Sequence, residues 1–547
     1  MSFSLHQRNS ILKQAQSENF DLLIIGGGIT GVGIALDAAS RGLKTVLVEK
    51  NDFAYGTSSR STKLIHGGLR YLKQFEFALV KEVGSERAVV HRLAPHLVLP
   101  EKMLLPLREG RGFGSLLTSF GLWLYDWLAG VKQADRRRML TRKQTLRAEP
   151  LLKKDGVKGG GLYAEYRTDD ARLTIEIAKT AHQHGAILLT YAQVENFIYT
   201  DGRVEGVQVN DLHTNATLSI KAKVVVNATG PWVDTLRTLD GSKQGKTLHL
   251  TKGVHIVVAY QRFPIKQAVY FDVADGRMIF AIPRGRTTYI GTTDTDYNAD
   301  IDAVGVTKAD VDYLLNAVNE SFPNVMLSER DVESSWAGLR PLIHEEGKSA
   351  SELSRKDEIF EAASGLLSIA GGKLTGYRKM AERVVDLLQK KYFADRKLKP
   401  CQTEQLKLTG ADFKSMRKLR LYLRTMRKDF QQINLSPYYA DYCVHLYGKQ
   451  SDEILKNTKH IINQGKNSEQ SLLQAELDFT IQHELVISAS DFFVRRTGML
   501  FFDMDRVLQY KDWVLTYLKD QFNWNTEEFE QETASLNKLI ADANHFH

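Results

Sequence analysis

The chain has 547 residues, of which 43% are hydrophobic and 25% charged, a globular composition with room for two to four domains. Its two cysteines, Cys401 and Cys443, exclude a disulfide framework and a cysteine-based metal site, so we expect a reducing compartment and no metal. The net charge of +8 and the pI near 9.0 favour an anionic partner: a phosphorylated substrate, an acidic membrane or a nucleic acid. The polar first 20 residues lack the apolar core of a signal peptide, so we expect the chain to stay where it is made.

The first predicted unit is a strand, a helix and a second strand between Phe20 and Lys50. The apolar run Leu22–Ile25 has the length and β-branched content of a strand. A glycine-rich turn and an alanine-rich helix ending at Arg41 follow it. The second strand, Thr45–Val48, ends at the acidic Glu49.

The turn in this unit carries the G-x-G-x-x-G pattern at Gly26, Gly28 and Gly31. Gly26 permits a tight turn, Gly28 lets the backbone touch a pyrophosphate, and Gly31 lets the helix pack closely on the strand. The helix N-terminus offers free N–H groups to the phosphates, and Glu49 can accept hydrogen bonds from ribose hydroxyls. Because the strand, helix, second strand and acid occur in order, the sequence predicts a dinucleotide-binding unit.

The segments after this unit alternate between loops and helices. Residues 56–72 pack Ser, Thr and Gly between charged residues, which predicts a loop, and a helix is expected over 75–93. Residues 113–131 are apolar but are interrupted by Asp126 and three glycines. A bilayer-spanning helix needs about 20 mainly apolar residues, so we favour a buried or interfacial helix pair here. A basic run follows at 132–143.

The rest of the chain reads first as mixed strands and helices and then as helices alone. The predicted elements are a helix at 174–184, a hairpin at 201–203, a strand at 224–226, a mixed sheet over 248–293, a helix at 307–320, a strand at 366–370 and a helix to about 390. From residue 396 the chain is polar, poor in glycine and helix-like.

Three later segments favour FAD over NAD as the dinucleotide. Residues 227–232 (NATGPW) bring small residues to a strand end, and residues 57–68 (TSSRSTKLIHGG) offer hydroxyls and amides to a pyrophosphate and ring. The unit at 371–376 (GGKLTG) opens another helix, whose positive end can stabilise negative charge on a reduced isoalloxazine.

The predicted fold is α/β with three parts. A Rossmann-like FAD-binding domain is discontinuous over 18–95, 155–245 and 356–395. A mixed α+β substrate-binding domain is inserted over 96–154 and 246–355, and an all-α domain follows at 396–547.

Several motifs resemble those of one enzyme family. IGGGITGVGIALDAASRGL, TSSRSTKLIHGGLRYL, VVNATGPWV, GTTDTDY, GLRPL and GGKLTGYRKMAE look like motifs of FAD-dependent glycerol-3-phosphate dehydrogenases, aerobic membrane-associated enzymes of the D-amino-acid-oxidase-like flavoprotein superfamily. The resemblance covers roughly residues 20–390, and DFFVRRTGML at 491–500 extends it into the last domain. It implies oxidation of sn-glycerol 3-phosphate to dihydroxyacetone phosphate, with electrons passed through FAD to ubiquinone or menaquinone.

The fingerprint and the resembling motifs give the residues expected at the cofactor. These are Gly26, Gly28, Ile29, Thr30, Gly31, Glu49, Thr57, Ser58, Lys63, Leu64, His66, Gly67, Gly68, Ala228, Gly230, Trp232, Gly372, Lys373, Leu374 and Thr375.

A phosphate monoester needs several cations in a partly desolvated site. The motif loops supply Arg70, Arg340, Arg355 and Lys373, and Tyr71 is expected to help hold the substrate. Each charged hydrogen bond contributes ~1.5–3 kcal/mol.

His255 in KGVHIVV matches a family histidine near the substrate. It is the favoured base, because an unperturbed pKa of about 6.5 suits proton transfer near neutrality. Lys373 and a cation-polarised water remain alternatives. The predicted catalytic residues are therefore His255, Arg340 and Lys373.

The segment 413–430 has apolar residues at helical spacing among seven basic ones. Two interpretations carry equal weight: a helix with a solvated basic face, and a membrane-surface helix. With the family, they predict a cytoplasmic enzyme attached peripherally to the anionic inner face of the cell membrane. Whether it forms a homodimer is left open.

Three competing functions remain. A glycerol-3-phosphate oxidase would use the same site with molecular oxygen and release hydrogen peroxide. An amine or amino-acid oxidase would need one carboxylate site rather than a cluster of cations. A nucleic-acid-binding role is not expected, since the basic C-terminal part lacks interleaved aromatic residues for stacking bases.

Overall fold

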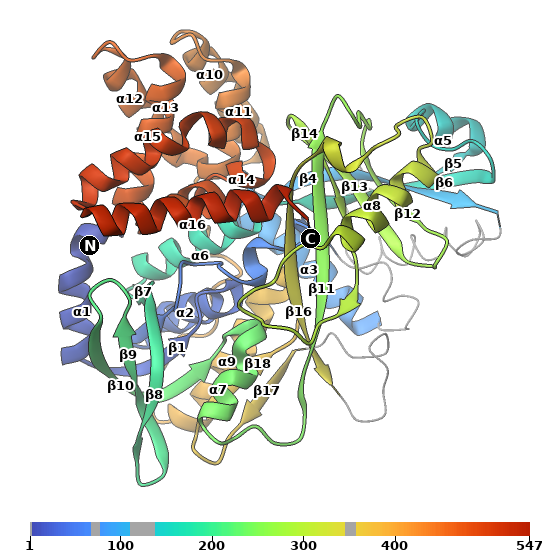
Figure 1. Cartoon of the computed structure of the whole chain (residues 1–547). Coiled ribbons are helices and arrows are strands. Elements are labelled where there is room, and N and C mark those ends of the chain that lie inside the picture. The colour runs from blue at the N-terminus through green and yellow to red at the C-terminus, as the bar shows by residue number, and fades with distance from the viewer. Residues whose placement is uncertain (1–2, 67–76, 110–136, 345–356, 547) are drawn as a thin grey trace.

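The computed structural model describes residues 3–66, 77–109, 137–344 and 357–546, which form two β-sheets and a helical C-terminal part (Figure 1). The strands of the first sheet are β1 (Asn19–Ile25), β2 (Thr45–Val48), β7 (Ile187–Leu189), β8 (Ala192–Thr200), β9 (Arg203–Asp211), β10 (Ala216–Asn227), β17 (Glu358–Glu361) and β18 (Leu367–Ala370). The strands of the second sheet are β3 (Leu64–Ile65), β4 (Leu99–Arg108), β5 (Arg138–Thr141), β6 (Val157–Arg167), β11 (Thr247–Ala259), β12 (Ala268–Asp272), β13 (Met278–Arg284), β14 (Thr287–Gly291), β15 (Thr295–Asp296) and β16 (Val332–His344).

The helices follow the same order along the chain. They are α1 (Arg8–Ser17), α2 (Ile29–Arg41), α3 (Phe77–Leu93), α5 (Arg142–Ala148), α6 (Asp170–Gln183), α7 (Val233–Leu239), α8 (Lys308–Ser321), α9 (Tyr377–Tyr392), α10 (Met416–Gln431), α11 (Pro437–Tyr447), α12 (Ser451–Ile462), α13 (Ser468–His483), α14 (Met499–Phe502), α15 (Met504–Phe522) and α16 (Thr526–Asn544). Short 3₁₀ turns at Thr57–Ser59 and Leu374–Gly376 and a π-helical turn at Asp491–Arg496 lie at functional motifs.

The first sheet has the strand order β17-β18-β10-β1-β2-β7 and is parallel from β18 to β7. Its central strands carry continuous apolar runs such as Leu22–Ile25, as expected for a parallel sheet covered on both faces. The hairpin β8–β9 extends it by pairing with β10. The strands predicted near residues 22, 45, 224 and 366 therefore share one sheet, which confirms the α/β fold class.

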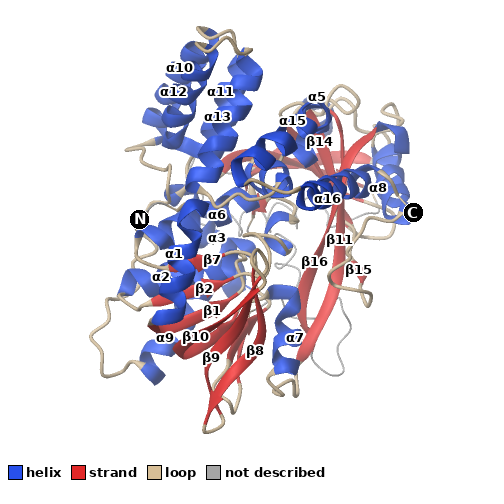
Figure 2. Cartoon of the chain, turned by 60° about the vertical axis from the view of Figure 1, so that its left-hand side comes forward, coloured by secondary structure: helices blue, strands red, loops and turns tan. Residues whose placement is uncertain are grey.

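Both faces of this sheet are covered. On one face α2 packs against α6 and α9, and a Cβ added to Gly33 would lie 2.9 Å from Tyr377 Cδ2, so this glycine lets α9 approach. On the other face, Ile11 and Leu12 of α1 share an apolar cluster with the β8–β9 hairpin. Figure 2 shows β7, β2, β1 and β10 side by side with α1 and α2 next to them.

The second sheet is built around the long antiparallel pair β11–β16 and continues through β14, β13, β12, β4, β6 and β3. The sheet predicted over 248–293 is confirmed, but β4, β6 and β16 were not predicted. The segment 155–245 was assigned to the cofactor domain, yet its first strand, β6, pairs with β4 in the second sheet. The glycine run in β6 hides the strand pattern, and packing requires it: a Cβ at Gly159 would lie 2.7 Å from the Leu140 carbonyl oxygen.

Alternation along β11 fixes the direction of its side chains. Val254, Ile256 and Val258 belong to the apolar cluster that contains the buried residues of α8. Val257 belongs to the cluster formed with the C-terminal helices. Because successive side chains of a strand point to opposite faces, His255 shares the face of Val257.

The C-terminal part is all-helical, as predicted, in that the last strand of the described residues is β18. α14 and α16 contact β16, and α10 to α13 form a bundle above them (Figure 1). In the same described ranges, no helix is both long and apolar enough to cross a membrane. The apolar stretch 113–131 and most of the basic run 132–143 lie outside the described residues.

Helix α10 corrects one of the two interpretations of the segment 413–430. Leu419, Met426 and Phe430 are buried in the core of the bundle, where they contact residues of the neighbouring helices. These side chains are therefore unavailable for insertion into a lipid interface. The spacing that suggested a membrane-surface helix instead reflects ordinary packing of an amphipathic helix.

A buried ion network joins the C-terminal part to the nucleotide-binding sheet. Arg496 donates to both oxygens of Asp52, at 2.6 and 2.8 Å, and Arg495 donates to Asp52 at 2.5 Å. Arg172 of α6 pairs with Glu484 in the same region. Burial alone would raise the pKa of Asp52, but the two guanidinium groups outweigh burial and hold the pKa below its usual value.

We expect Asp52→Asn to destabilise the folded chain by about 3–5 kcal/mol, because it leaves two buried guanidinium groups without a carboxylate. Urea unfolding followed by circular dichroism measures this change. Glu329→Gln, which breaks the exposed Lys308–Glu329 pair, is the control and should leave the unfolding midpoint nearly unchanged. Equal midpoints for the two variants would show that the Asp52 network does not stabilise the junction.

Candidate active site

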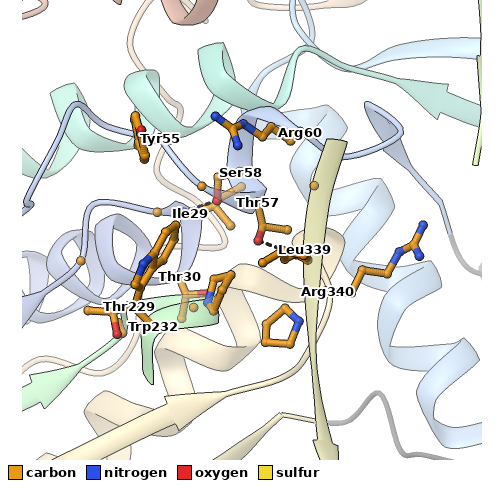
Figure 3. A pocket seen from close by; sticks show the side chains of 18 of the residues that line it. Ile29, Thr30, Tyr55, Thr57, Ser58, Arg60, Thr229, Trp232, Leu339 and Arg340 are labelled. Carbon is orange, nitrogen blue, oxygen red and sulfur yellow. Dashed lines mark hydrogen bonds between the residues drawn. The ribbon is translucent and has the colours of Figure 1, made fainter. Parts of the chain in front are cut away.

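A cavity of about 460 Å³ opens at the carboxyl ends of β1, β10 and β18 and continues along β11 and β16 (Figure 3). Ligands of open parallel sheets bind outside the carboxyl ends of the strands, so this is the expected place for a nucleotide. The wall includes Ile25, Ala228 and Gly371 from the first sheet and His255 and Leu339 from the second. The structure thus brings the predicted cofactor and substrate motifs to one cavity.

The glycine turn between β1 and α2 is compressed to the point where side chains cannot fit. A Cβ on Gly31 would lie 1.9 Å from the carbonyl oxygen of Gly26, and one on Gly26 would lie 2.7 Å from that of Ala228. Gly26 also has a φ of +113°. Gly28, Ile29 and Thr30 line the cavity, whereas Gly31 lies behind it and supports the helix.

Glu49 connects the second strand to this turn. Its Oε2 accepts from the Gly27 N–H at 2.6 Å, and its Oε1 accepts from the Asn51 N–H at 2.9 Å. Burial raises the pKa of Glu49, while the two N–H donors oppose that shift. The carboxylate also lines the cavity, so it can hold the turn and face a ribose together.

The loop from Thr57 to Leu64 ties the two sheets together across the cavity. Ser58 Oγ accepts from the Ile29 N–H at 3.0 Å, at the start of α2. Thr57 Oγ1 donates to the Leu339 carbonyl oxygen in β16 at 2.7 Å. Thr57, Ser58 and Leu64 all line the cavity, as the sequence predicted for residues near the cofactor.

Lys63, predicted at the cofactor, lies outside the cavity wall and is only 2% exposed. Its Nζ donates to Asp170 of α6 at 2.6 Å and to the Ser59 carbonyl oxygen at 2.9 Å. Its backbone has a φ of +55°, which turns the side chain back into the protein. Lys63 therefore holds the loop to α6, and the position of its ammonium corrects the sequence-based prediction.

The remaining predicted cofactor segments come from two strand ends. Ala228, Gly230 and Trp232 line the cavity after β10, and Trp232 Nε1 donates to Asp302 at 3.0 Å. After β18, the wall is formed by Gly372, Lys373, Leu374 and Thr375. His66 also lines the cavity, and its carbonyl oxygen accepts from Thr375 Oγ1 at 3.4 Å. Helix α9 begins at Tyr377, directly behind this segment, so its N-terminus faces the cavity region.

His255 lines the cavity from β11 with 1% exposure. Its ring stacks on Trp336 with 4.8 Å between centroids, and Nε2 lies 3.0 Å from Thr62 Oγ1. A Cβ on Gly291 would lie 2.1 Å from His255 Cδ2, so the neighbouring strand fits closely against the ring. Burial, together with the charges of Arg340 and Lys63, holds the pKa of His255 well below its usual value. The imidazole is therefore neutral near pH 7 and able to accept a proton.

Arg340 reaches the same cavity from β16, one register position from His255 along the β11–β16 pair on the cavity side. Its Nη1 donates to Asp294 at 2.8 Å and its Nη2 donates to Thr292 Oγ1 at 2.9 Å. Both partners belong to the GTTDTDY motif, whose role the sequence left open. These contacts hold the guanidinium in a fixed direction while leaving its side chain 24% exposed.

Some predicted positions cannot be placed, and some wall residues were not predicted. Gly67, Gly68, Arg70, Tyr71 and Arg355 lie outside the described residues. The sequence analysis did not single out Tyr55, Arg60, Thr62, Trp336 or Asp294. Thr62 and Arg60 stand inside the quoted loop motif and Asp294 inside GTTDTDY, so the signal was present; Trp336 had none.

The wall suits a dinucleotide. A turn that admits only glycine, the first residues of α2 and the buried Glu49 provide places for a pyrophosphate and a ribose, and the cavity continues to the His255 end, where a flavin ring would meet a substrate.

Comparison with known families agrees with this geometry. The model described as FAD dependent oxidoreductase matches residues 21–378, and the model described as the C-terminal domain of alpha-glycerophosphate oxidase matches residues 401–529. The chain belongs to the FAD-dependent oxidoreductase family, and FAD is its cofactor.

Individual relatives narrow this class. The chain is 49% identical to aerobic glycerol-3-phosphate dehydrogenase of Bacillus subtilis, over 99% of this chain and 98% of the relative. It is 48% identical to the protein of the same name from Staphylococcus aureus, over 100% and 98%. A solved glycerol-3-phosphate dehydrogenase from Bacillus halodurans, complexed with FAD, matches with a TM-score of 0.85 at 45% identity, covering 99% and 98% of the two chains.

A more distant structure shows the same fold alone. The L-alpha-glycerophosphate oxidase from Mycoplasma pneumoniae matches with a TM-score of 0.54 at 20% identity, over 70% of this chain and 96% of the other.

We expect Glu49→Gln to weaken FAD retention by roughly tenfold or more, because an amide cannot accept from two N–H donors with both of its ends. Its NH₂ group would face one of the backbone donors, Gly27 or Asn51. Titration of deflavinated protein with FAD, followed by flavin fluorescence, gives the dissociation constant. The control is Glu195→Gln, an acid of β8 that lies outside the cavity wall. Wild-type affinity in the Glu49 variant would contradict the assigned role.

Proposed function

We propose that the chain oxidises sn-glycerol 3-phosphate to dihydroxyacetone phosphate and passes the electrons to a membrane quinone. The observation that carries the proposal is the convergence of Arg340, Lys373 and neutral His255 on the far end of the FAD cavity. Cations there suit a phosphate monoester, and a neutral imidazole suits removal of a hydroxyl proton. The names of the relatives from B. subtilis, S. aureus and B. halodurans support the same substrate.

Arg340 and Lys373 bind the phosphate in this proposal. A guanidinium binds phosphate oxygens through two parallel N–H donors when its plane is fixed, and Asp294 and Thr292 fix that plane. Lys373 approaches from the other sheet, at the start of the 3₁₀ turn before α9. Arg70, Tyr71 and Arg355 are proposed as further substrate ligands on the family motifs alone.

The chemistry requires two transfers from the carbinol group. Bound FAD supplies the acceptor for the hydride that leaves the carbinol carbon, and it hands the two electrons on to the quinone. His255 accepts the hydroxyl proton at a ring nitrogen, so that the C–H and O–H bonds are replaced by a C=O bond. Thr62 and Trp336 orient the imidazole, and the closeness of Gly291 prevents the ring from turning away.

The lowered pKa of His255 refines the sequence argument for this base. An ordinary value of about 6.5 would leave part of the imidazole protonated at neutral pH. The lower value keeps the base form fully populated, at the cost of weaker basicity. The positive charge of Arg340, which contributes to the shift, would be partly neutralised by the substrate phosphate, and this raises the basicity of His255 when substrate is bound.

Oxygen is the alternative acceptor. It is favoured by the match of residues 401–529 to a domain model named after alpha-glycerophosphate oxidase. An oxidase would release hydrogen peroxide from the same site.

The proposed location is the cytoplasmic face of the cell membrane, with peripheral attachment. The support is the exposed side of α10, where Arg417, Lys418, Arg420, Arg424 and Lys428 lie outside the packed core and have no ion pair among the described residues. Each cation near an anionic bilayer contributes about 1 kcal/mol, which salt screens. Because the apolar side of α10 is packed in the bundle, attachment through this helix would be electrostatic.

We expect His255→Asn to slow flavin reduction by glycerol 3-phosphate by roughly 100-fold or more without loss of FAD. In the wild type, the lowered pKa means that the reduction rate stays level as pH falls from about 8 to about 6, where a free histidine would become protonated. Anaerobic stopped-flow absorbance measures both. His249→Asn, on the same strand but paired with exposed Asp296, serves as control and should reduce normally. A normal rate in His255→Asn would assign the proton to Lys373 or water.

The acceptor is tested by reoxidation. Enzyme reduced anaerobically with glycerol 3-phosphate is mixed with a short-chain quinone or with air-saturated buffer, and we expect the quinone to reoxidise the flavin much faster. Vesicles containing anionic lipid should sediment the enzyme at low salt, and reversal of Arg417, Arg420 and Arg424 to Glu should weaken sedimentation. Fast peroxide formation in air, with protein that remains free of vesicles at every salt concentration, would favour the oxidase.

A further inference from the structure

Arg60 is a cation of the cavity wall that neither the sequence motifs nor the proposed reaction uses. It lies at the end of the 3₁₀ turn Thr57–Ser59, and its guanidinium lies 5.6 Å from the centre of the Tyr55 ring. Among the described residues it has no carboxylate partner, and no side-chain hydrogen bond is formed. Burial lowers the pKa of Arg60, so the charge is held in a poorly solvated place.

Other buried arginines of the protein show what such a charge normally requires. Arg172, Arg378 and Arg496 are each paired with one or more carboxylates at 3.0 Å or less. A buried cation without a counter-ion is costly, so the cavity is expected to receive an anion near Arg60.

The backbone of Arg60 is fixed from both sides. The Arg60 N–H donates to the Thr57 carbonyl oxygen at 3.1 Å, and a Cβ on Gly338 of β16 would lie 2.6 Å from the Arg60 carbonyl oxygen. Thr57 is itself bonded to Leu339 of β16. The guanidinium is therefore presented to the cavity from a rigid position rather than from a free loop.

Its direction identifies the anion. Ser58, two residues earlier, accepts from the first N–H of α2, where a pyrophosphate would meet the helix N-terminus. Tyr55 follows Ala54, whose N–H donates to the Gly27 carbonyl oxygen in the glycine turn. Figure 3 shows the Arg60 guanidinium directed toward Tyr55 and away from Arg340. It thus faces the pyrophosphate end of the cavity and not the substrate end.

We propose that Arg60 binds the pyrophosphate of FAD and supplies the positive charge that balances it. The planar guanidinium can donate to oxygens of both phosphates, while Tyr55 supports its opposite face. The proposal rests on the FAD dependence of the family and leaves the substrate open. Arg60 is then a cofactor-binding residue of this chain, additional to the glycine turn.

The test separates the pyrophosphate from the rest of the cofactor. Deflavinated full-length wild type, Arg60→Gln and Arg60→Lys are titrated with FAD, ADP and adenosine, with Arg277→Gln as a control arginine that lies over an exposed-side tyrosine far from the cavity wall. We expect Arg60→Gln to bind FAD and ADP roughly tenfold to a hundredfold more weakly and adenosine as tightly as the wild type. Arg60→Lys should lie in between, and the salt dependence of FAD binding should become shallower in Arg60→Gln.

Other outcomes would overturn the proposal. Unchanged ADP affinity with a raised KM for glycerol 3-phosphate would place Arg60 at the substrate, and unchanged ADP affinity with a shifted flavin potential would place it at the ring. An equal loss for ADP and adenosine would indicate general damage to the cavity, which the melting temperature of each variant would reveal. A wild type that binds no FAD would count against the family cofactor itself and is distinguishable from failure of the Arg60 variant alone.

Discussion

The active site depends on one buried ion pair, between Lys63 and Asp170. It sits behind the loop that crosses from the nucleotide-binding sheet to the second sheet, and it holds that loop against α6. In front of it, Ser58 meets the start of α2, Thr57 meets β16, and Thr62 meets His255. A pair this deeply buried is stable only when both partners stay in place, so the loop has one position. That position sets the separation between the cofactor end and the substrate end of the cavity.

Charge is distributed differently behind the cavity wall and on it. Behind the wall, cations such as Arg496 are neutralised by carboxylates, and these pairs join the C-terminal helices to the segment after Glu49. On the wall, burial lowers the pKa of both His255 and Arg60. A cavity that disfavours positive charge in this way strengthens its attraction to phosphate groups, because an anion regains what the desolvated cation has lost. The same lack of solvation keeps His255 neutral.

Much of the site was predictable because its constraints are local. The glycines of the first turn are fixed by contacts over five residues, as the 1.9 Å approach at Gly31 shows, and such spacing is visible in sequence. His255 was recognisable as a polar residue in an apolar strand. Lys63 was misplaced because its direction depends on a backbone with φ of +55° and on Asp170, more than 100 residues away.

Parts of the fold were missed for similar reasons. The strand β6 owes its glycines to close contacts with β5 and α5, which no local pattern announces. For α10, the sequence shows an apolar side and a basic side but not what covers the apolar side, and the bundle covers it. Arg60 was overlooked because a cation among serines resembles a solvated loop residue, and only the structure shows that it is desolvated and faces the cavity.

The central claim is that the far end of the FAD cavity is built for a phosphorylated alcohol. Anaerobic flavin reduction with sn-glycerol 3-phosphate and with glycerol, in the wild type and in Arg340→Gln, tests it most directly. The wild type should reduce flavin far more efficiently with the phosphate ester, and Arg340→Gln should lose most of that preference, at ~2–3 kcal/mol for one charged contact. Equal efficiency of the wild type on the two alcohols would contradict a phosphate site.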